Sequence, residues 1–202
     1  MNDTISHYHH HASTLAAQYD ALAFSTVHQS WLPRLAAMPV GQALDVGAGS
    51  GRDARGLQQL GWQVTAIEPA TGLRQLAQQS PDDGIEWRDD QLPQLITLAE
   101  GAGRFQLILL SAVWMHLPTA QRAPALARLS TLLADNGLLV ISLRHGPSEP
   151  GRPMYPVSVD ELIELAQPLG LTLELPDNQT LAQDCLNREA VRWQTVILQY
   201  RM

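Results

Sequence analysis

Residues 44–54 read Leu-Asp-Val-Gly-Ala-Gly-Ser-Gly-Arg-Asp-Ala. The apolar run that leads into this stretch, Gln42–Val46, is typical of a buried strand, and Arg52–Leu60 beyond it has the pattern of a helix. Glycine tolerates positive φ angles and lets a ligand come close to the backbone. A glycine-rich turn between a buried strand and a helix therefore predicts a ligand site outside the carboxyl end of a strand in an open α/β sheet.

The spacing of the glycines distinguishes between cofactors. A dinucleotide site requires G-x-G-x-x-G, whereas here the order is Gly47, Gly49, Gly51, and Arg52 takes the place of the last glycine. An acid, Glu68, ends the next predicted strand. A carboxylate at that position can accept hydrogen bonds from both hydroxyls of a ribose. The pattern indicates a ribose partner without the fingerprint of a pyrophosphate site.

Strands and helices alternate from residue 40 to residue 143, which predicts βαβ units, a parallel sheet and helices on both of its faces. In the tail, a helix at Val159–Leu169 is followed by two strands, Leu171–Leu175 and Val191–Gln199, with no helix between them, so an antiparallel hairpin at the sheet edge is expected. The other predicted strands are Gln42–Val46, Gln63–Ile67, Ile85–Arg88, Phe105–Leu110 and Leu138–Leu143, and the predicted helices are Arg52–Leu60, Ala70–Gln79, Gln94–Glu100 and Thr119–Ala134, the last closed by Asn136-Gly137.

The first 38 residues have a different character. Apolar residues between Leu15 and Ala23 recur at helical spacing, and a second helix is expected near residues 27–37. We therefore expect a single domain over residues 1–202, composed of an N-terminal helical lid (1–38) and an α/β core (40–202).

Composition restricts the function further. The formal charge of −7 argues against general binding to nucleic-acid phosphates. All 13 basic residues are arginine, which excludes Schiff-base chemistry. No apolar run is long enough to span a membrane, so a cytoplasmic protein is expected. His7, His9, His10 and His11 lack a cysteine or a clustered acid nearby, and no metal site is predicted.

With these motifs in place, the chain resembles the class I S-adenosylmethionine-dependent methyltransferases, well over residues 40–145 and in outline elsewhere. The stretch Gly51-Arg52-Asp53-Ala54 and the tail from Asn187 to Thr195 are similar to small bacterial enzymes of this class, including tellurite-resistance types. The resemblance implies a Rossmann-like three-layer αβα sandwich with a mostly parallel seven-stranded sheet and an antiparallel C-terminal strand. It also implies S-adenosylmethionine as the cofactor.

The same resemblance assigns cofactor contacts. The glycine turn would wrap the methionine part, Glu68 would hold the ribose, and either Asp89 or Asp90 would touch the adenine. The full set of implied cofactor residues is Asp45, Gly47, Ala48, Gly49, Gly51, Arg52, Glu68, Pro69, Asp89, Asp90, Gln91, Leu92, Ser111, Ala112 and Trp114.

Candidate catalytic residues are His116, Tyr19 and Arg144. His116 follows a strand and is either a general base or a structural histidine. Tyr19 either closes over the cofactor or packs in the core. Arg144, at the end of the fifth strand, either binds a carboxylate or forms a rim salt bridge. Trp114 either faces the sulfonium through a cation–π contact or belongs to the core.

These observations predict methyl transfer from S-adenosylmethionine to a small molecule, in a pocket between the N-terminal helices, the loop after the fourth strand and residues 145–156. Two alternatives stay open. One is cyclisation of the cofactor itself with release of methylthioadenosine, as in azetidine-2-carboxylate synthases. The other is a cofactor-binding subunit without catalysis. The oligomeric state is not predicted.

Overall fold

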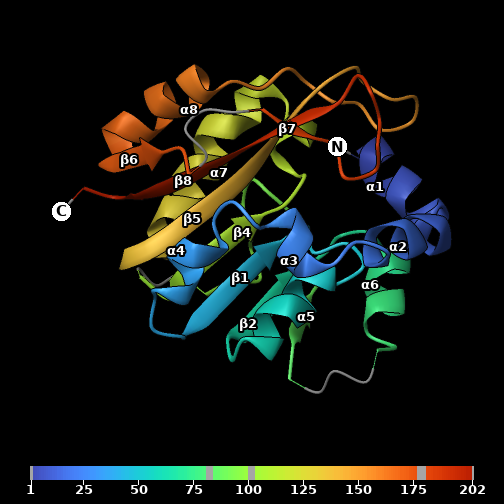
Figure 1. The fold of residues 1–202 in the computed structure, drawn as a ribbon, viewed down its shortest axis with the longest axis horizontal. Coiled ribbons are helices and arrows are strands. Elements are labelled where there is room, and N and C mark those ends of the chain that lie inside the picture. Colours follow the sequence, from blue (N-terminus) through green and yellow to red (C-terminus); the bar gives the residue numbers. More distant parts are fainter. Residues whose placement is uncertain (1, 81–83, 100–102, 177–180, 202) are drawn as a thin grey trace.

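A computed structural model describes residues 2–80, 84–99, 103–176 and 181–201 of the chain. Over these residues one sheet of eight strands forms the centre of the fold, in the order β3-β2-β1-β4-β5-β8-β6, with β7 paired to β8 (Figure 1). The strands are β1 Gln42–Val46, β2 Gln63–Ile67, β3 Glu86–Arg88, β4 Phe105–Leu110, β5 Leu133–His145, β6 Leu171–Glu174, β7 Ala182–Gln183 and β8 Arg192–Tyr200.

Two apolar clusters cover the two faces of the sheet, because neighbouring residues of a strand point in opposite directions. On one face, Leu44 and Val46 of β1 pack in a cluster with residues of α7 (Thr119–Leu132) and α8 (Val159–Ala166). On the other face, Ala43 packs in a cluster with Trp31 and with residues of α4 (Leu32–Ala36) and α5 (Arg52–Gln59). The predicted three-layer αβα sandwich with a mostly parallel sheet is confirmed, but the described residues form eight strands instead of the seven expected, because the short β7 adds to β8.

The N-terminal helices separate into two groups. Helices α1 (Asn2–His10) and α2 (Ala12–Asp20) pack on α6 (Thr71–Ala77) through a small cluster that includes Leu15 and Leu73, beside the sheet (Figure 1). Helices α3 (Phe24–Val27) and α4 form in place of the single helix expected near residues 27–37, and Trp31 between them belongs to the main core. The first 38 residues therefore contribute both a layer of the sandwich and a pair of helices outside it.

The predicted helix Gln94–Glu100 is wrong for residues 94–99, which form turns; Glu100 lies outside the described residues. The carboxylate of Asp90 accepts hydrogen bonds from the backbone N–H groups of Gln91 (2.8 Å) and Thr97 (2.7 Å) and from the Thr97 hydroxyl (2.7 Å). Leu95 has a left-handed φ of 48°. These side-chain contacts replace the backbone hydrogen bonds that a helix would make.

The boundary between α7 and β5 also differs from the prediction. The helix ends at Leu132 and β5 begins at Leu133, so Asn136-Gly137 lies within the strand rather than at a helix end. The register against β4 shifts there, since Phe105 pairs with Leu133 but Leu107 pairs with Leu138. A Cβ at Gly137 would lie 2.9 Å from the Phe105 carbonyl oxygen, so this glycine serves the close approach of two strands rather than a helix cap.

The C-terminal strands confirm the expected antiparallel pairing of Leu171–Glu174 with the last strand. The last strand is not at the edge, however. β8 pairs antiparallel with β5 on one side and with β6 and β7 on the other. The 3₁₀-helix η2 (Gln167–Leu169) continues the predicted helix Val159–Leu169 beyond α8.

Candidate active site

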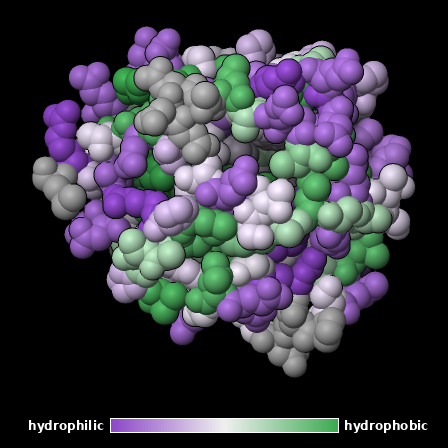
Figure 2. All heavy atoms as spheres, viewed as in Figure 1, coloured by the Kyte–Doolittle hydropathy of each residue, from purple (hydrophilic) through white to green (hydrophobic). Residues whose placement is uncertain are grey.

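A cavity of about 290 Å³ opens at the carboxyl ends of the parallel strands, where the sequence places its ligand site. Its volume is close to the lower end of small-molecule pockets, which is roughly 300 Å³. The walls come from α1, α2, the glycine turn, the loops after β2, β3, β4 and β5, and residues 182–188. On the face seen in Figure 2 hydrophilic side chains are interspersed with smaller apolar groups.

The glycine turn forms one end of the cavity. Gly47, Gly49 and Gly51 all have positive φ angles, of 73°, 58° and 82°. The N–H groups of Gly47 and Ala48 donate to the Ile67 carbonyl oxygen at 2.8 and 2.9 Å, which ties the turn to the end of β2. A Cβ at Gly47 would lie 2.5 Å from the Val113 side chain, so a larger residue does not fit there.

Glu68 lies next to this turn and is almost completely buried. Its Oε2 accepts a hydrogen bond from the Gly49 N–H (2.8 Å) and its Oε1 accepts one from the Ala70 N–H (2.7 Å). Burial raises the pKa of Glu68 to about 7, although both backbone N–H groups act in the opposite direction. Each oxygen keeps a lone pair for a further donor, which is the capacity that two ribose hydroxyls require.

The loop after β3 adds a second wall. Of the two acids there, Asp90 lines the cavity and Asp89 does not; Asp89 is largely exposed and pairs with Arg74 at 2.7 Å. Asp90 uses its carboxylate to fix the turn described above. Gln91 also lines the cavity, and its buried Oε1 has no hydrogen-bond partner among the described residues. An unpaired amide oxygen in the cavity that Glu68 also lines fits a ligand with a donor group, such as an amino-substituted base.

The structure brings most of the expected cofactor residues to this one cavity. Lining it are Gly47, Ala48, Gly49, Arg52, Glu68, Pro69, Asp90, Gln91, Leu92, Ser111 and Ala112. Asp45, Gly51, Asp89 and Trp114 are not among its lining residues. The eleven lining residues agree with a nucleoside-sized ligand between the glycine turn and the loops after β2, β3 and β4.

Trp114 and Asp45 are placed differently from the expectation. Trp114 is fully buried in the apolar cluster beneath α7, so its position does not support a contact with the sulfonium. Asp45 is buried with its Oδ2 unpaired among the described residues, and burial and the neighbouring Asp53 raise its pKa. The Arg52 guanidinium donates to both oxygens of Asp53, at 2.7 and 2.8 Å. Arg52 is therefore already paired within the protein.

His116 and Tyr8 also line the cavity. Pro153 offers only a carbonyl oxygen, 3.0 Å from His116 Nδ1, so Nδ1 carries the hydrogen. Nε2 then accepts a hydrogen bond from the Tyr8 hydroxyl at 3.0 Å. Burial lowers the pKa of His116, with Arg152 and Arg144 adding to the effect. The imidazole is therefore neutral near pH 7 and holds its lone pair toward the cavity, which suits a general base.

Tyr19 and Arg144 line the same cavity. Burial, with Tyr8 nearby, raises the pKa of Tyr19 well above its usual value, so its hydroxyl donates and does not act as a base. Its ring lies opposite the turn, 3.8 Å from where a Cβ of Gly49 would be. The Arg144 side chain is almost fully buried and donates to the Pro147 carbonyl oxygen (2.8 Å) and to Glu149 (3.2 Å).

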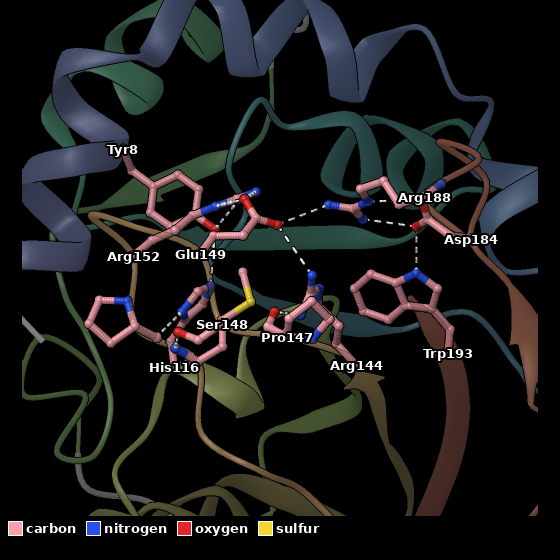
Figure 3. A network of polar contacts seen from close by, with 12 residues as sticks. Tyr8, His116, Arg144, Pro147, Ser148, Glu149, Arg152, Asp184, Arg188 and Trp193 are labelled. Carbon is pink, nitrogen blue, oxygen red and sulfur yellow. Dashed lines mark hydrogen bonds and ion pairs between the residues drawn. The ribbon is translucent and has the colours of Figure 1, made fainter. Parts of the chain in front are cut away.

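Sequence reasoning missed one wall of the cavity. Arg152, Asp184 and Arg188 line it, and Glu149 joins them to Arg144 in one polar network (Figure 3). The loop 145–156 was expected at the pocket, but no residue within it was singled out. Residues 182–188 show neither helical nor strand periodicity. Asn187 and Arg188 begin the tail that resembles small bacterial enzymes of this class, but the resemblance assigns them no role at the site.

The described part of the chain contains no helix with the length and apolar character that a membrane crossing requires. Among the same residues, no group of three histidine, cysteine or acidic side chains could hold a metal ion. The N-terminal His7 and His11 rings stack on each other with centroids 4.2 Å apart.

Known proteins with similar sequences share the expected class. Residues 2–184 match the family described as Methyltransferase domain, so the chain belongs to this family. An uncharacterized methyltransferase of Alkaliphilus oremlandii (strain OhILAs) is 29% identical over 126 residues, 59% of this chain and 53% of that protein. The ubiquinone biosynthesis O-methyltransferase of Caulobacter sp. (strain K31) is 32% identical over 102 residues, 49% of this chain and 39% of that protein. The chain thus spans about half of the first relative and less of the second.

Solved structures agree in fold. A 1,6-didemethyltoxoflavin-N1-methyltransferase of Burkholderia thailandensis, with S-adenosylhomocysteine bound, has a TM-score of 0.75 at 18% identity and covers 100% of this chain and 88% of its own. A TehB-like methyltransferase of Corynebacterium glutamicum has a TM-score of 0.66 at 24% identity, covering 98% of both chains. The resemblance to class I methyltransferases, inferred from the motifs, is confirmed.

Proposed function

We propose that the chain transfers a methyl group from S-adenosylmethionine to a small-molecule acceptor. The observation that carries the proposal is that two groups of residues line one cavity, the glycine turn with Glu68 and the pair Tyr8 and His116. The structural neighbour from Burkholderia thailandensis holds S-adenosylhomocysteine, the demethylated cofactor, and a small heterocyclic substrate in a similar fold. This likeness supports the same cofactor and a small acceptor here.

The first of these two groups would hold the cofactor. Glu68 would accept hydrogen bonds from the two ribose hydroxyls, and the unpaired Gln91 Oε1 would accept one from the adenine. The glycine turn, closed over by Tyr19, would leave room for the aminobutyryl arm at Gly49, which carries no side chain and faces the Tyr19 ring. When bound, the cofactor supplies an electrophilic methyl group on its sulfonium. Alignment of an acceptor against that methyl can lower the barrier by roughly 7–11 kcal/mol.

In the second group, His116 would receive the acceptor's proton by way of the Tyr8 hydroxyl. Its Nε2 lone pair is held toward the cavity by the Nδ1–H···O contact to Pro153. Tyr8 donates to Nε2 and lines the cavity, so it can take the acceptor's proton while giving its own to the imidazole. The lid role of α1 and α2 belongs to the same proposal. Tyr8 lies on α1 and Tyr19 on α2, so their movement would open or close the cavity over both ligands.

The test separates the three candidate functions by product. Purified protein is incubated with S-adenosylmethionine alone and with a panel of phenols, N-heterocycles and carboxylic acids, and S-adenosylhomocysteine and methylthioadenosine are quantified. The proposal expects S-adenosylhomocysteine only when an acceptor is present. Methylthioadenosine from the cofactor alone would instead establish cyclisation. Binding of S-adenosylhomocysteine by calorimetry with no turnover of any acceptor would favour a non-catalytic subunit.

Variants assign the residues. His116→Gln should reduce turnover by about 100-fold or more, the usual contribution of a general base, while leaving the affinity for S-adenosylhomocysteine within about twofold. Tyr155→Phe provides a control, because Tyr155 is not a lining residue of the cavity. Unchanged turnover in His116→Gln would remove the histidine from the mechanism without affecting the cofactor assignment.

A further inference from the structure

Three arginines meet at the wall of the cavity beside His116. Arg144 is at the end of β5, Arg152 is in the loop that follows, and Arg188 precedes β8 (Figure 3). All three line the cavity. Their side chains are exposed by 2%, 11% and 31% respectively, so two of the three guanidinium groups are largely withdrawn from solvent.

One carboxylate, that of Glu149, lies among the three guanidinium groups. Its Oε1 is 3.2 Å from Arg144 Nη2 and 3.5 Å from Arg188 Nη1. Its Oε2 accepts from Arg152 Nε at 2.9 Å and from Arg152 Nη2. Arg188 also binds Asp184 through two nitrogens, each at 2.8 Å. The site between the guanidinium groups of Arg144, Arg152 and Arg188, called the seat below, therefore already has the dimensions and the donors that a carboxylate requires.

The charges of this wall do not cancel. Among the described residues the three arginines face two carboxylates, Glu149 and Asp184, which leaves one positive charge within this network in a chain whose formal charge is −7. Burial and the neighbouring Arg188 lower the pKa of Arg144, so its environment opposes the charge it carries. The Arg144 Nε is buried without a hydrogen-bond partner among the described residues. A buried unpaired donor on a charged group is costly unless a ligand completes it.

We infer that this seat binds the carboxylate of an acidic acceptor, and that Glu149 occupies it in the absence of the acceptor. The inference rests on the proposed function and names the class of its substrate, a small carboxylic acid. Because Glu149 contacts the same arginines that the acceptor would, the exchange replaces each contact with an equivalent one. Glu149 lies in the loop between Gly146 and Gly151, and about a third of its side chain is exposed, so it has a route out.

The position of the seat fits methyl transfer. Arg152 Nη1 is 3.3 Å from the Tyr8 hydroxyl, which is 3.0 Å from His116 Nε2. A carboxylate held by Arg152 therefore brings the rest of a small molecule toward the tyrosine and the histidine. The arginines would also fix the orientation of a carboxylate bound at this point.

The experiment measures binding by calorimetry with S-adenosylhomocysteine at saturation. The probes are benzoate, 4-hydroxybenzoate, phenylacetate and succinate, each beside its primary amide, and inorganic phosphate. We expect at least one acid to bind about tenfold or more tightly than its amide, as the loss of a charge-assisted contact requires. Glu149→Gln should raise the affinity for that acid by about tenfold and leave the affinity for the amide unchanged, because the side chain that competes for the arginines is then neutral.

Two further variants test the seat itself. Arg144→Gln and Arg188→Gln should each lower the affinity for the acid by about tenfold or more. Arg192→Gln is the matched control, since Arg192 donates to the backbone oxygens of Glu189 and Val191 and does not line the cavity. Thermal melting shows whether Arg144→Gln folds, and if it does not, Arg188→Gln and Glu149→Gln decide.

Several outcomes would overturn the inference. The inference fails if the amides bind as tightly as their acids, or if the affinity for the acid is unchanged in Glu149→Gln. It also fails if neither the wild type nor Glu149→Gln binds any of the acids, or if phosphate binds more tightly than every acid. A tenfold loss of affinity for S-adenosylhomocysteine itself in Arg188→Gln would assign the seat to the cofactor's own carboxylate and would also overturn it. Failure of the wild-type chain to bind S-adenosylhomocysteine would instead refute the proposed function, so the two failures are distinguishable.

Discussion

The raised pKa of Glu68 makes cofactor affinity depend on pH. In the free protein its carboxyl group has a pKa of about 7, because it is buried. Ribose hydroxyls that donate to it stabilise the ionised form and lower that pKa in the complex. Binding at pH 6 must therefore remove a proton from most molecules, whereas binding at pH 8 need not. About one unit below the pKa this adds about 1.4 kcal/mol, which is a factor of about ten in affinity.

The assay is calorimetry with S-adenosylhomocysteine at pH 6 and pH 8. The wild-type affinity should be about tenfold higher at pH 8, and repeating the titration at pH 6 in buffers of different ionisation enthalpy should show a proton released on binding. Glu68→Gln should lose this pH dependence. It should also bind about 10- to 100-fold more weakly at pH 8, because an amide oxygen replaces a charged acceptor that already serves Gly49 and Ala70.

Glu86→Gln is the control for this prediction. Glu86 contacts Arg88 and Thr65 on β3 and β2 and does not line the cavity, so the variant should keep the wild-type pH dependence. The reasoning is refuted if the wild-type affinity is the same at both pH values, or if Glu68→Gln retains the tenfold change.

Four other outcomes follow from the structure. In the free protein the pKa of Glu68 is raised from 4.5 to about 7, so its contribution to folding is present below pH 4.5 and is lost as pH rises through 7. In urea unfolding, the free energy of unfolding of Glu68→Gln should therefore rise by about 3 kcal/mol relative to that of the wild type between pH 4.5 and pH 8. A difference that stays constant with pH would contradict this. Gly47→Ala should lower the free energy of unfolding by more than Gly170→Ala does. Both glycines have a φ of 73°, so both variants carry a backbone strain of about 1–2 kcal/mol, but only at Gly47 would the new Cβ meet a side chain, that of Val113. Equal losses in the two variants would contradict this clash. Arg122→Ala should lower the free energy of unfolding by about 3 kcal/mol, because the buried guanidinium donates to the Leu117 carbonyl oxygen and to Glu161, whereas the exposed Arg34→Ala should change it by less than about 0.5 kcal/mol. Tyr8→Phe should raise the pKa of His116 in an NMR titration, because the hydroxyl stabilises the neutral imidazole; an unchanged value would show that the contact has no influence.

The sequence predicted the parts of the fold that depend on local pattern. The strands Gln42–Val46, Gln63–Ile67 and Phe105–Leu110 were predicted with their observed bounds, because each is a buried apolar run bounded by turn residues. The predicted helix was wrong for residues 94–99 because the Asp90 side chain, just before the segment, accepts hydrogen bonds from the Thr97 N–H and hydroxyl. The end of α7 was wrong because Asn-Gly usually follows a helix, whereas here Gly137 permits contact with β4.

The site divides in the same way. The glycine turn and Glu68 were found from their spacing, since the chain itself places them at successive strand ends. Between Asp89 and Asp90 the sequence offered no choice; only the fold shows which of the two faces the cavity. Glu149, Arg152 and Arg188 come together because β8 pairs with β5, which brings the chain before β8 next to the loop after β5. Contacts of that range leave no periodic signal along the chain.

The interior position of β8 has a consequence for biosynthesis. A chain emerging from the ribosome completes β5 at His145 and supplies its partner only from Arg192 onward. At about 5–20 residues per second this interval lasts roughly 2 to 9 s, during which one edge of a largely apolar strand has no neighbour. Nascent chains of this protein should therefore pass through a state with an incomplete sheet whose unpaired edge can bind other chains. Slow synthesis over residues 146–191 should favour aggregation or chaperone binding.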